Sequence, residues 1–180
     1  MLTNILIVLA VVVILFVIIV ALRPSGFRVA RSTTVTASPA ITFQQVNDLH
    51  QYLAWNPFSK SDPAAKNTFT GPPAGIGASL AWAGNRQLGE GRLTVTESCP
   101  DELVRYRLEF LKPFKATNTA EFIFKSEGRQ TTVEWSMTGK RNFMFKAVGL
   151  FMNCDKMIGG MFEQGLANLK AAAEATSAQS

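Results

Sequence analysis

The sequence contains few of the residues that usually perform catalysis or bind metal ions. It has a single histidine, His50, and two cysteines, Cys99 and Cys154. Zinc sites need several histidine or cysteine ligands held close together, so the sequence predicts no metal site. His50 lies in a polar-flanked segment without a partner in the pattern, and we interpret it as a solvated or satisfied side chain rather than a general base. We assign no catalytic residue and expect no cofactor.

Two cysteines are also too few for a disulfide framework in a chain of this size. Cys154 falls on the apolar side of a helical pattern, so we expect it in the core and interpret both residues as reduced thiols. If the domain lay outside the cell, Cys99 and Cys154 could pair instead.

Several functional motifs are missing as well. There is no nucleophile elbow and no P-loop, because Gly75-Ile76-Gly77 and Gly89-Glu90-Gly91 do not lie between a strand and a helix. We interpret these glycines as bends in a curved sheet. No dense cluster of lysine and arginine and no aromatic-basic ribonucleoprotein motif occurs, so we predict no nucleic-acid partner.

Charge is absent from the first part of the chain. The segment from Ile5 to Leu22 contains no charged and no polar side chain. At about 1.5 Å per residue, this run is long enough to cross a hydrocarbon core of roughly 30 Å. A cleaved signal peptide would have a shorter apolar region and a basic start. We therefore predict an uncleaved transmembrane anchor at 1–23, a short linker at 24–26, a folded domain at 27–175 and a frayed tail at 176–180.

The orientation of this anchor follows from the charges beside it. No lysine or arginine precedes the apolar run, whereas Arg23, Arg28 and Arg31 follow it closely. The positive-inside rule then places the domain on the cytoplasmic side rather than the periplasmic or extracellular side. The net charge of +5 would favour contact with anionic lipid headgroups.

The clearest helical pattern lies at the C-terminal end of the sequence. Between Arg141 and Ala175 apolar side chains recur at helical spacing, and we predict one long, gently broken helix. Its apolar stripe must be buried. The stripe consists of Ala147, Leu150, Phe151, Cys154, Ile158, Met161, Phe162, Gly165, Leu166 and Leu169.

The middle of the sequence alternates between apolar and polar residues, as is typical of strands. We expect strands at 27–36, 78–82, 88–96, 103–111, 119–125 and 131–138, one or two short helices within 38–55, and an irregular stretch between them and the second strand. Such a meander has one apolar face, and the C-terminal helix has the apolar area to cover it. The predicted fold class is α+β, with a curved antiparallel sheet around the long C-terminal helix and one transmembrane helix in front.

Four segments of the domain resemble motifs of a known family. They are Trp55-Asn56-Pro57-Phe58, the glycines Gly71, Gly75 and Gly77 followed by Trp82, Gly89-Glu90-Gly91, and the ending from Phe162 to Lys170, FEQGLANLK. With the order of elements, they are similar to the START-like (SRPBCC) superfamily with its helix-grip fold, and most of all to its bacterial polyketide cyclase/dehydrase-like branch. The resemblance covers Phe27 to Glu174. Its motifs are structural, so they indicate the fold rather than the activity.

The residues expected between sheet and helix are large and aromatic or flexible. A compact core and a ligand cavity both fit this pattern, and the resemblance favours the cavity. The predicted ligand-binding residues are Trp82, Tyr106, Phe110, Phe122, Phe124, Trp135, Phe151, Met157 and Met161.

Three functions remain open from the sequence. The first is a membrane-anchored domain that binds a hydrophobic small molecule or lipid in the cavity. The second, implied by the resemblance, is a polyketide cyclase or dehydratase, which would need an acid, base or amide cluster inside; our strand phases place Glu90, Glu109, Glu121 and Glu134 on the wet face instead. The third is a non-catalytic envelope or stress-associated adaptor, which would expose an apolar patch on the outer face of the sheet.

Overall fold

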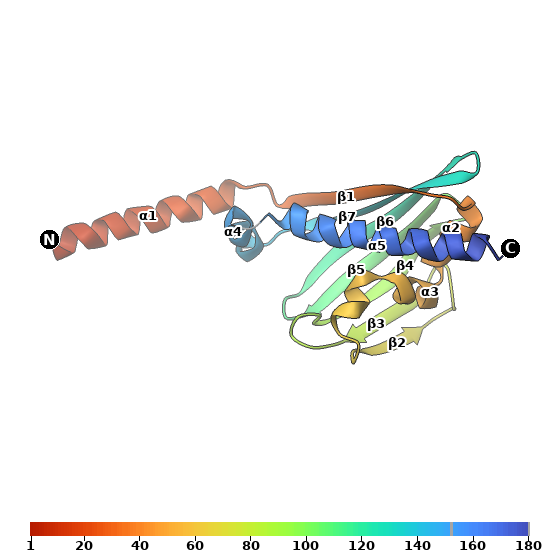
Figure 1. Ribbon diagram of the computed structural model, residues 1–180. Helices are drawn as coiled ribbons and strands as arrows, with labels where there is room; N and C mark the ends of the chain where they lie inside the picture. The colour runs from red at the N-terminus through yellow and green to blue at the C-terminus, as the bar shows by residue number, and fades with distance from the viewer. Residues whose placement is uncertain (152, 180) are drawn as a thin grey trace.

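The computed structural model describes residues 1–151 and 153–179 of the chain. It contains an N-terminal helix, one long sheet, two short helices and two C-terminal helices (Figure 1). In chain order the elements are α1 (Leu2–Leu22), β1 (Gly26–Val35), α2 (Pro39–Asn47), α3 (Leu49–Trp55), the short 3₁₀ helix η1 (Pro57–Ser61), β2 (Lys66–Thr70), β3 (Ser79–Ala83), β4 (Glu90–Cys99), β5 (Leu103–Lys112), β6 (Ala116–Glu127), β7 (Gln130–Lys140), α4 (Phe143–Phe151) and α5 (Cys154–Ser177).

Helix α1 projects away from the rest of the molecule (Figure 1). Between Thr3 and Leu22 it is long and apolar enough to cross a membrane, and nearly all of this segment is exposed. The predicted apolar helix at the N-terminus is therefore present. Length and composition alone do not distinguish an anchor from a signal sequence.

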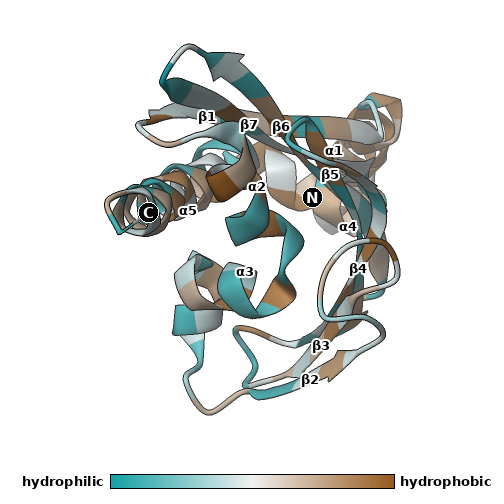
Figure 2. Ribbon diagram, turned by 90° about the vertical axis from the view of Figure 1, so that its right-hand side faces the viewer, coloured by the Kyte–Doolittle hydropathy of each residue, from teal (hydrophilic) through white to brown (hydrophobic). Residues whose placement is uncertain are grey.

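The sheet is antiparallel throughout, with the strand order β1-β7-β6-β5-β4-β3-β2. It curves from β1 round to β2, and α2, α3 and α5 lie on its concave side (Figure 2). The predicted helix-grip architecture is confirmed. The sheet has one strand more than expected, since β2 lies within the stretch we interpreted as irregular.

Alternating burial along the central strands agrees with the predicted faces. On β6, Ala120, Phe122 and Phe124 are buried, and on β7 the inward residues include Val133 and Trp135. The period of two residues puts these side chains on the concave face, where the hydrophobic effect favours their burial. They form one core together with α2, α3 and the second half of α5.

The C-terminal helix is the main correction to the predicted fold. We expected one rod with a single buried stripe, but α4 ends at Phe151 and α5 begins at Cys154, where Asn153 caps it by accepting a hydrogen bond from the Lys156 amide. Only α5 packs on the sheet, and α4 has no buried residue. Ala147, Leu150 and Phe151 are therefore not core residues, while the predicted core position of Cys154 falls on a side chain outside the described part of the structure.

Polar contacts hold α5 along β1, the edge strand of the sheet. Arg31 of β1 contacts Glu163 at 2.8 Å and Asp155 at 3.2 Å, and Glu174 accepts a hydrogen bond of 2.8 Å from the Thr36 amide. The helix continues to Ser177, slightly beyond the predicted end at residue 175.

Candidate ligand-binding cavity

A cavity of about 320 Å³ lies between the sheet, α3, η1 and the first half of α5. Small-molecule sites typically measure roughly 300–1,000 Å³, so this space is large enough for a ligand. Its wall is mostly apolar. The lining residues are Tyr52, Leu53, Asn56, Phe58, Ser59, Ser61, Ala65, Asn67, Leu80, Trp82, Gln87, Leu88, Leu93, Leu108, Phe110, Ala120, Trp135, Met137, Ile158 and Phe162.

Short local motifs place η1 and α3 over this space. Asp48 caps α3 through the His50 amide, and Asn56 accepts a hydrogen bond from the Phe58 amide at the start of η1. Asn168 of α5 donates to the Trp55 carbonyl oxygen at 2.9 Å. The sheet therefore forms one wall, and the capped segment 48–61, tied to α5, forms the opposite one.

A glycine allows one aromatic ring to lie flat along the wall. A Cβ atom at Gly91 would lie 2.3 Å from Cζ2 of Trp82, so no larger residue fits at this position of β4 without displacing the ring. Phe110 meets Trp82 edge-on, with ring centroids 6.1 Å apart. The predicted bend at Gly89-Glu90-Gly91 thus also makes room for a ring at the cavity wall.

Three of the lining residues carry a polar group without a partner among the described residues. The indole nitrogens of Trp82 and Trp135 are buried and make no hydrogen bond. Among the described residues the Tyr52 hydroxyl also has no hydrogen-bond partner, although the Tyr52 side chain is buried. Buried polar groups are normally paired, so two unpaired indole nitrogens on lining residues of one cavity are unusual.

The neighbouring tyrosine differs from Tyr52. The hydroxyl of Tyr106 donates a hydrogen bond of 2.6 Å to the Val46 carbonyl oxygen and lies behind the wall. Burial raises the pKa of both hydroxyls well above the ordinary value, because the phenolate is poorly solvated there. Tyr52 is therefore a neutral donor or acceptor at any ordinary pH.

The predicted site residues fall into three groups. Trp82, Phe110 and Trp135 line the cavity. Tyr106, Phe122 and Phe124 are buried in the core behind the wall, and Met161 is half-buried on α5; these four do not line it.

We expected Phe151 and Met157 to line the cavity, and this prediction is wrong for both residues. Phe151 is 81% exposed and Met157 is 56% exposed. The reason is the break after α4, which turns Phe151 away from the sheet, and the position of Met157 on the outer side of the first turns of α5.

Tyr52 and Phe58 line the cavity although no sequence pattern indicated them as ligand-binding residues. Tyr52 lies on the buried side of α3, and Phe58 follows it in the Trp55-Asn56-Pro57-Phe58 motif. The motif was recognised, but its position over the cavity depends on how η1 folds back toward Trp135, whose ring centroid lies 6.4 Å from that of Phe58.

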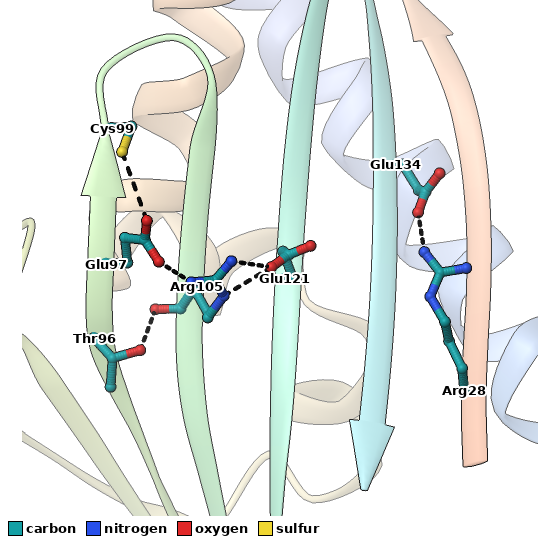
Figure 3. Close-up of polar contacts among 7 residues, drawn as sticks. All are labelled: Arg28, Thr96, Glu97, Cys99, Arg105, Glu121 and Glu134. Atoms are coloured by element: carbon teal, nitrogen blue, oxygen red, sulfur yellow. Dashed lines mark hydrogen bonds and ion pairs between the residues drawn. The ribbon is translucent and has the colours of Figure 1, made fainter. Parts of the chain in front are cut away.

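Carboxylates lie on the other face of the sheet. Arg105 contacts Glu97 and Glu121, and Arg28 contacts Glu134 on neighbouring strands (Figure 3). Glu90 and Glu109 pair with Lys112 and Arg107 respectively. None of these acids lines the cavity, as the predicted strand phases require. Among the residues that the structure describes, no cluster of histidine, cysteine and acidic side chains could hold a metal ion.

Many solved structures have the same fold as this protein. The Aha1 dimer from Colwellia psychrerythraea is 16% identical, with a TM-score of 0.59 over 82% of this chain and 96% of that chain. TTHA0849 from Thermus thermophilus is 19% identical (TM-score 0.59, 84% and 99%), and the major latex-like protein 151 from Panax ginseng is 10% identical (TM-score 0.55, 84% and 97%). At these identities the likeness concerns the fold alone.

Among curated proteins no sequence match is found. A family described as polyketide cyclase / dehydrase and lipid transport matches residues 26–174, which include every strand and nearly all of α5. The matched region begins at the first residue of β1 and leaves out α1. Fold and sequence agree, and the chain belongs to the polyketide cyclase / dehydrase and lipid transport family.

Proposed function

We propose that this protein is a membrane-anchored carrier that binds a hydrophobic small molecule or lipid between the sheet and α5. The observation on which the proposal rests is the cavity of about 320 Å³ with a largely apolar wall. Apolar walls favour apolar guests, because both surfaces leave water on binding. In this proposal α1 is an uncleaved anchor at 1–23, the linker is 24–26, and the binding domain is 27–175 on the cytoplasmic side.

The unpaired polar groups define the ligand further. Tyr52 is a lining residue with a free hydroxyl, and Trp82 and Trp135 are lining residues whose buried indole N–H groups have no partner. A guest with an acceptor such as a carbonyl or hydroxyl oxygen would satisfy donors that otherwise remain unpaired at a cost. We therefore expect an amphiphile, apolar over most of its surface, rather than a pure hydrocarbon.

The family also includes cyclases and dehydrases, so an enzyme is the competing function. Such chemistry needs a group that exchanges a proton near neutral pH. Tyr52 is the only titratable side chain among the described lining residues, and its raised pKa suits a hydrogen-bond donor better than a base. The observed wall therefore supports a carrier.

Native mass spectrometry of the full chain in detergent, followed by lipid extraction, tests the carrier. Ala120 lines the cavity from β6, and Ala120→Leu would fill part of it. We expect a bound molecule in the unaltered protein and at least about a tenfold loss of it in this variant. Ala81→Leu on β3, which is outside the lining, is the matched control and should retain the ligand. Equal ligand content in both variants would exclude this cavity as the site.

A further inference from the structure

Helix α4 is an apolar helix that buries none of its residues in the domain. Lys146 is its only polar side chain. Phe151 is 81% and Met144 62% exposed. A helix with this composition is normally hidden in a core or in a membrane.

The position of α4 indicates what covers its apolar side chains. It lies between the end of α1 and the beginning of α5, beyond the ends of β1 and β7 (Figure 1). Lys146 donates to the Ala21 carbonyl oxygen at 3.3 Å, and Arg23 donates to the Gly149 carbonyl oxygen at 3.3 Å. Thus α4 contacts the very end of the helix that we propose to span the bilayer.

A second apolar segment lies beside α4. Leu111 at the end of β5 and Phe114 in the loop that follows are exposed, and the ring of Phe114 meets Phe145 of α4 edge-on at 5.9 Å. The loop and the helix are far apart in the sequence but form one apolar surface. We call α4 and residues 111–115 the docking surface.

Most charges around the docking surface are positive, although Glu90 pairs with Lys112 of this surface at 2.8 Å. Residues 1–47, 110–120 and 135–154 contain no aspartate or glutamate. The same segments supply Arg23, Lys115, Lys140, Arg141 and Lys146, and within the described structure none of these cations makes an ion pair with an acid. A basic rim around an apolar face matches the anionic headgroups and acyl chains of a bilayer surface.

We propose that the docking surface lies in the headgroup–acyl boundary of an anionic phospholipid bilayer, in the leaflet from which α1 emerges. This inference rests on the proposed anchoring by α1. It goes beyond a tether, because two contacts with the bilayer fix the tilt of the domain where one helix and a short linker would not. The same end of the sheet bears the cavity residues Phe110 and Leu88, so a docked domain holds that end of the cavity against the lipid.

Photochemical cross-linking tests the contact. The full chain is reconstituted into vesicles of phosphatidylcholine and phosphatidylglycerol that contain a phospholipid with a diazirine in its acyl chain, and adducts are mapped by mass spectrometry. We expect adducts on α1, on α4 and on 111–115, and none on the hairpin at Gly128, which is at the other end of β6.

Two substitutions and a control define the result. Met144→Asp together with Phe151→Asp alters only exposed side chains, and should lower the α4 adducts at least about tenfold while α1 remains labelled. Ile76→Asp is the matched control, since Ile76 is 64% exposed but lies near the opposite end of the sheet, and should change nothing.

The outcomes separate this inference from the proposed anchor. Adducts on α1 without adducts on α4 would overturn the docking surface and leave the anchor intact. Loss of adducts on α1 would contradict the anchor itself. Protein–protein cross-links through α4 in place of lipid adducts would show that a second copy of the chain covers the helix, and would also overturn the proposal.

Discussion

The ring of Phe162 on α5 stacks on the indole of Trp135 on β7, with centroids 4.1 Å apart and planes within 7° of each other. On its other side Trp135 stacks on Phe122 of β6 at 4.9 Å. The three rings join helix and sheet in one stack, and each is at least nine-tenths buried. This aromatic stack is a central packing contact between α5 and the sheet.

We expect Phe162→Ala to lower the free energy of unfolding by about 3 kcal/mol, the lower end of the range for buried phenylalanine. The cost is limited because Phe162 already borders a cavity and loses contacts on one side only. Urea unfolding of the detergent-solubilised chain, followed by tryptophan fluorescence, measures it. Met157→Ala on the same helix is the control and should stay within about 0.5 kcal/mol, since Met157 is exposed.

Much of this arrangement could be predicted because periodicity reports burial. Val104, Tyr106 and Phe122 alternate with polar residues, and the stripe through Phe162 and Leu166 has helical spacing; each is buried as expected. Strand β2 escaped prediction because its sequence, KNTFT, is polar and mostly exposed, so its pairing with β3 leaves no apolar pattern.

The break before α5 could not be predicted for a different reason. Apolar spacing continues through Phe143–Phe151, and periodicity does not say what an apolar face contacts. The sequence also could not decide whether a cavity exists, because the same aromatic residues can fill an interior or surround a space. Whether these side chains leave a cavity depends on the curvature of the sheet and on where η1 places Phe58.

Loss of the hydroxyl should affect stability more strongly at Tyr106 than at Tyr52. Tyr106→Phe removes the hydrogen bond to the Val46 carbonyl and leaves that acceptor unpaired, so we expect a loss of about 1–2 kcal/mol in unfolding free energy. Tyr52→Phe removes a hydroxyl without a partner in the described structure and should cost less than about 0.5 kcal/mol.

Ligand content should show the reverse order. We expect Tyr52→Phe to lower retention of the co-purified molecule by about tenfold, because the loss of one hydrogen bond to a neutral acceptor is worth roughly 1.5 kcal/mol at most. Tyr106→Phe should retain the ligand. Quantitative extraction of both variants measures this, and unchanged retention in Tyr52→Phe would show that the hydroxyl does not contact the guest.

Glu174 should make the stability of the fold depend on pH in the acidic range. The hydrogen bond from the Thr36 amide holds the pKa of Glu174 below its ordinary value in the folded state, with a smaller contribution from Lys170. A lowered folded pKa stabilises the fold above the unfolded pKa, and this part is lost as the pH falls through the folded value. Melting temperatures below about pH 4.5 should therefore decline less steeply in Glu174→Gln than in the unaltered chain. If the melting temperatures of the two proteins fell equally steeply with pH, Glu174 would not contribute to this pH dependence.

Two glycines of α5 should respond with opposite signs to the same substitution. A Cβ at Gly165 would lie 2.5 Å from Cζ3 of Trp135 and 3.0 Å from Cδ of Pro57, whereas one at Gly160 would meet nothing within 4 Å. Gly165→Ala should therefore lower the unfolding free energy by about 1–3 kcal/mol through overpacking.

Gly160→Ala should raise it by up to about 1 kcal/mol, since alanine has the higher helix propensity. Urea titration of both variants gives the comparison. Because helix propensity favours alanine equally at both positions, the difference between them measures the contacts with Trp135 and Pro57. A stabilised Gly165→Ala would mean that α5 can move off the ring, and that the space between helix and sheet adapts to its contents rather than being fixed by the stack.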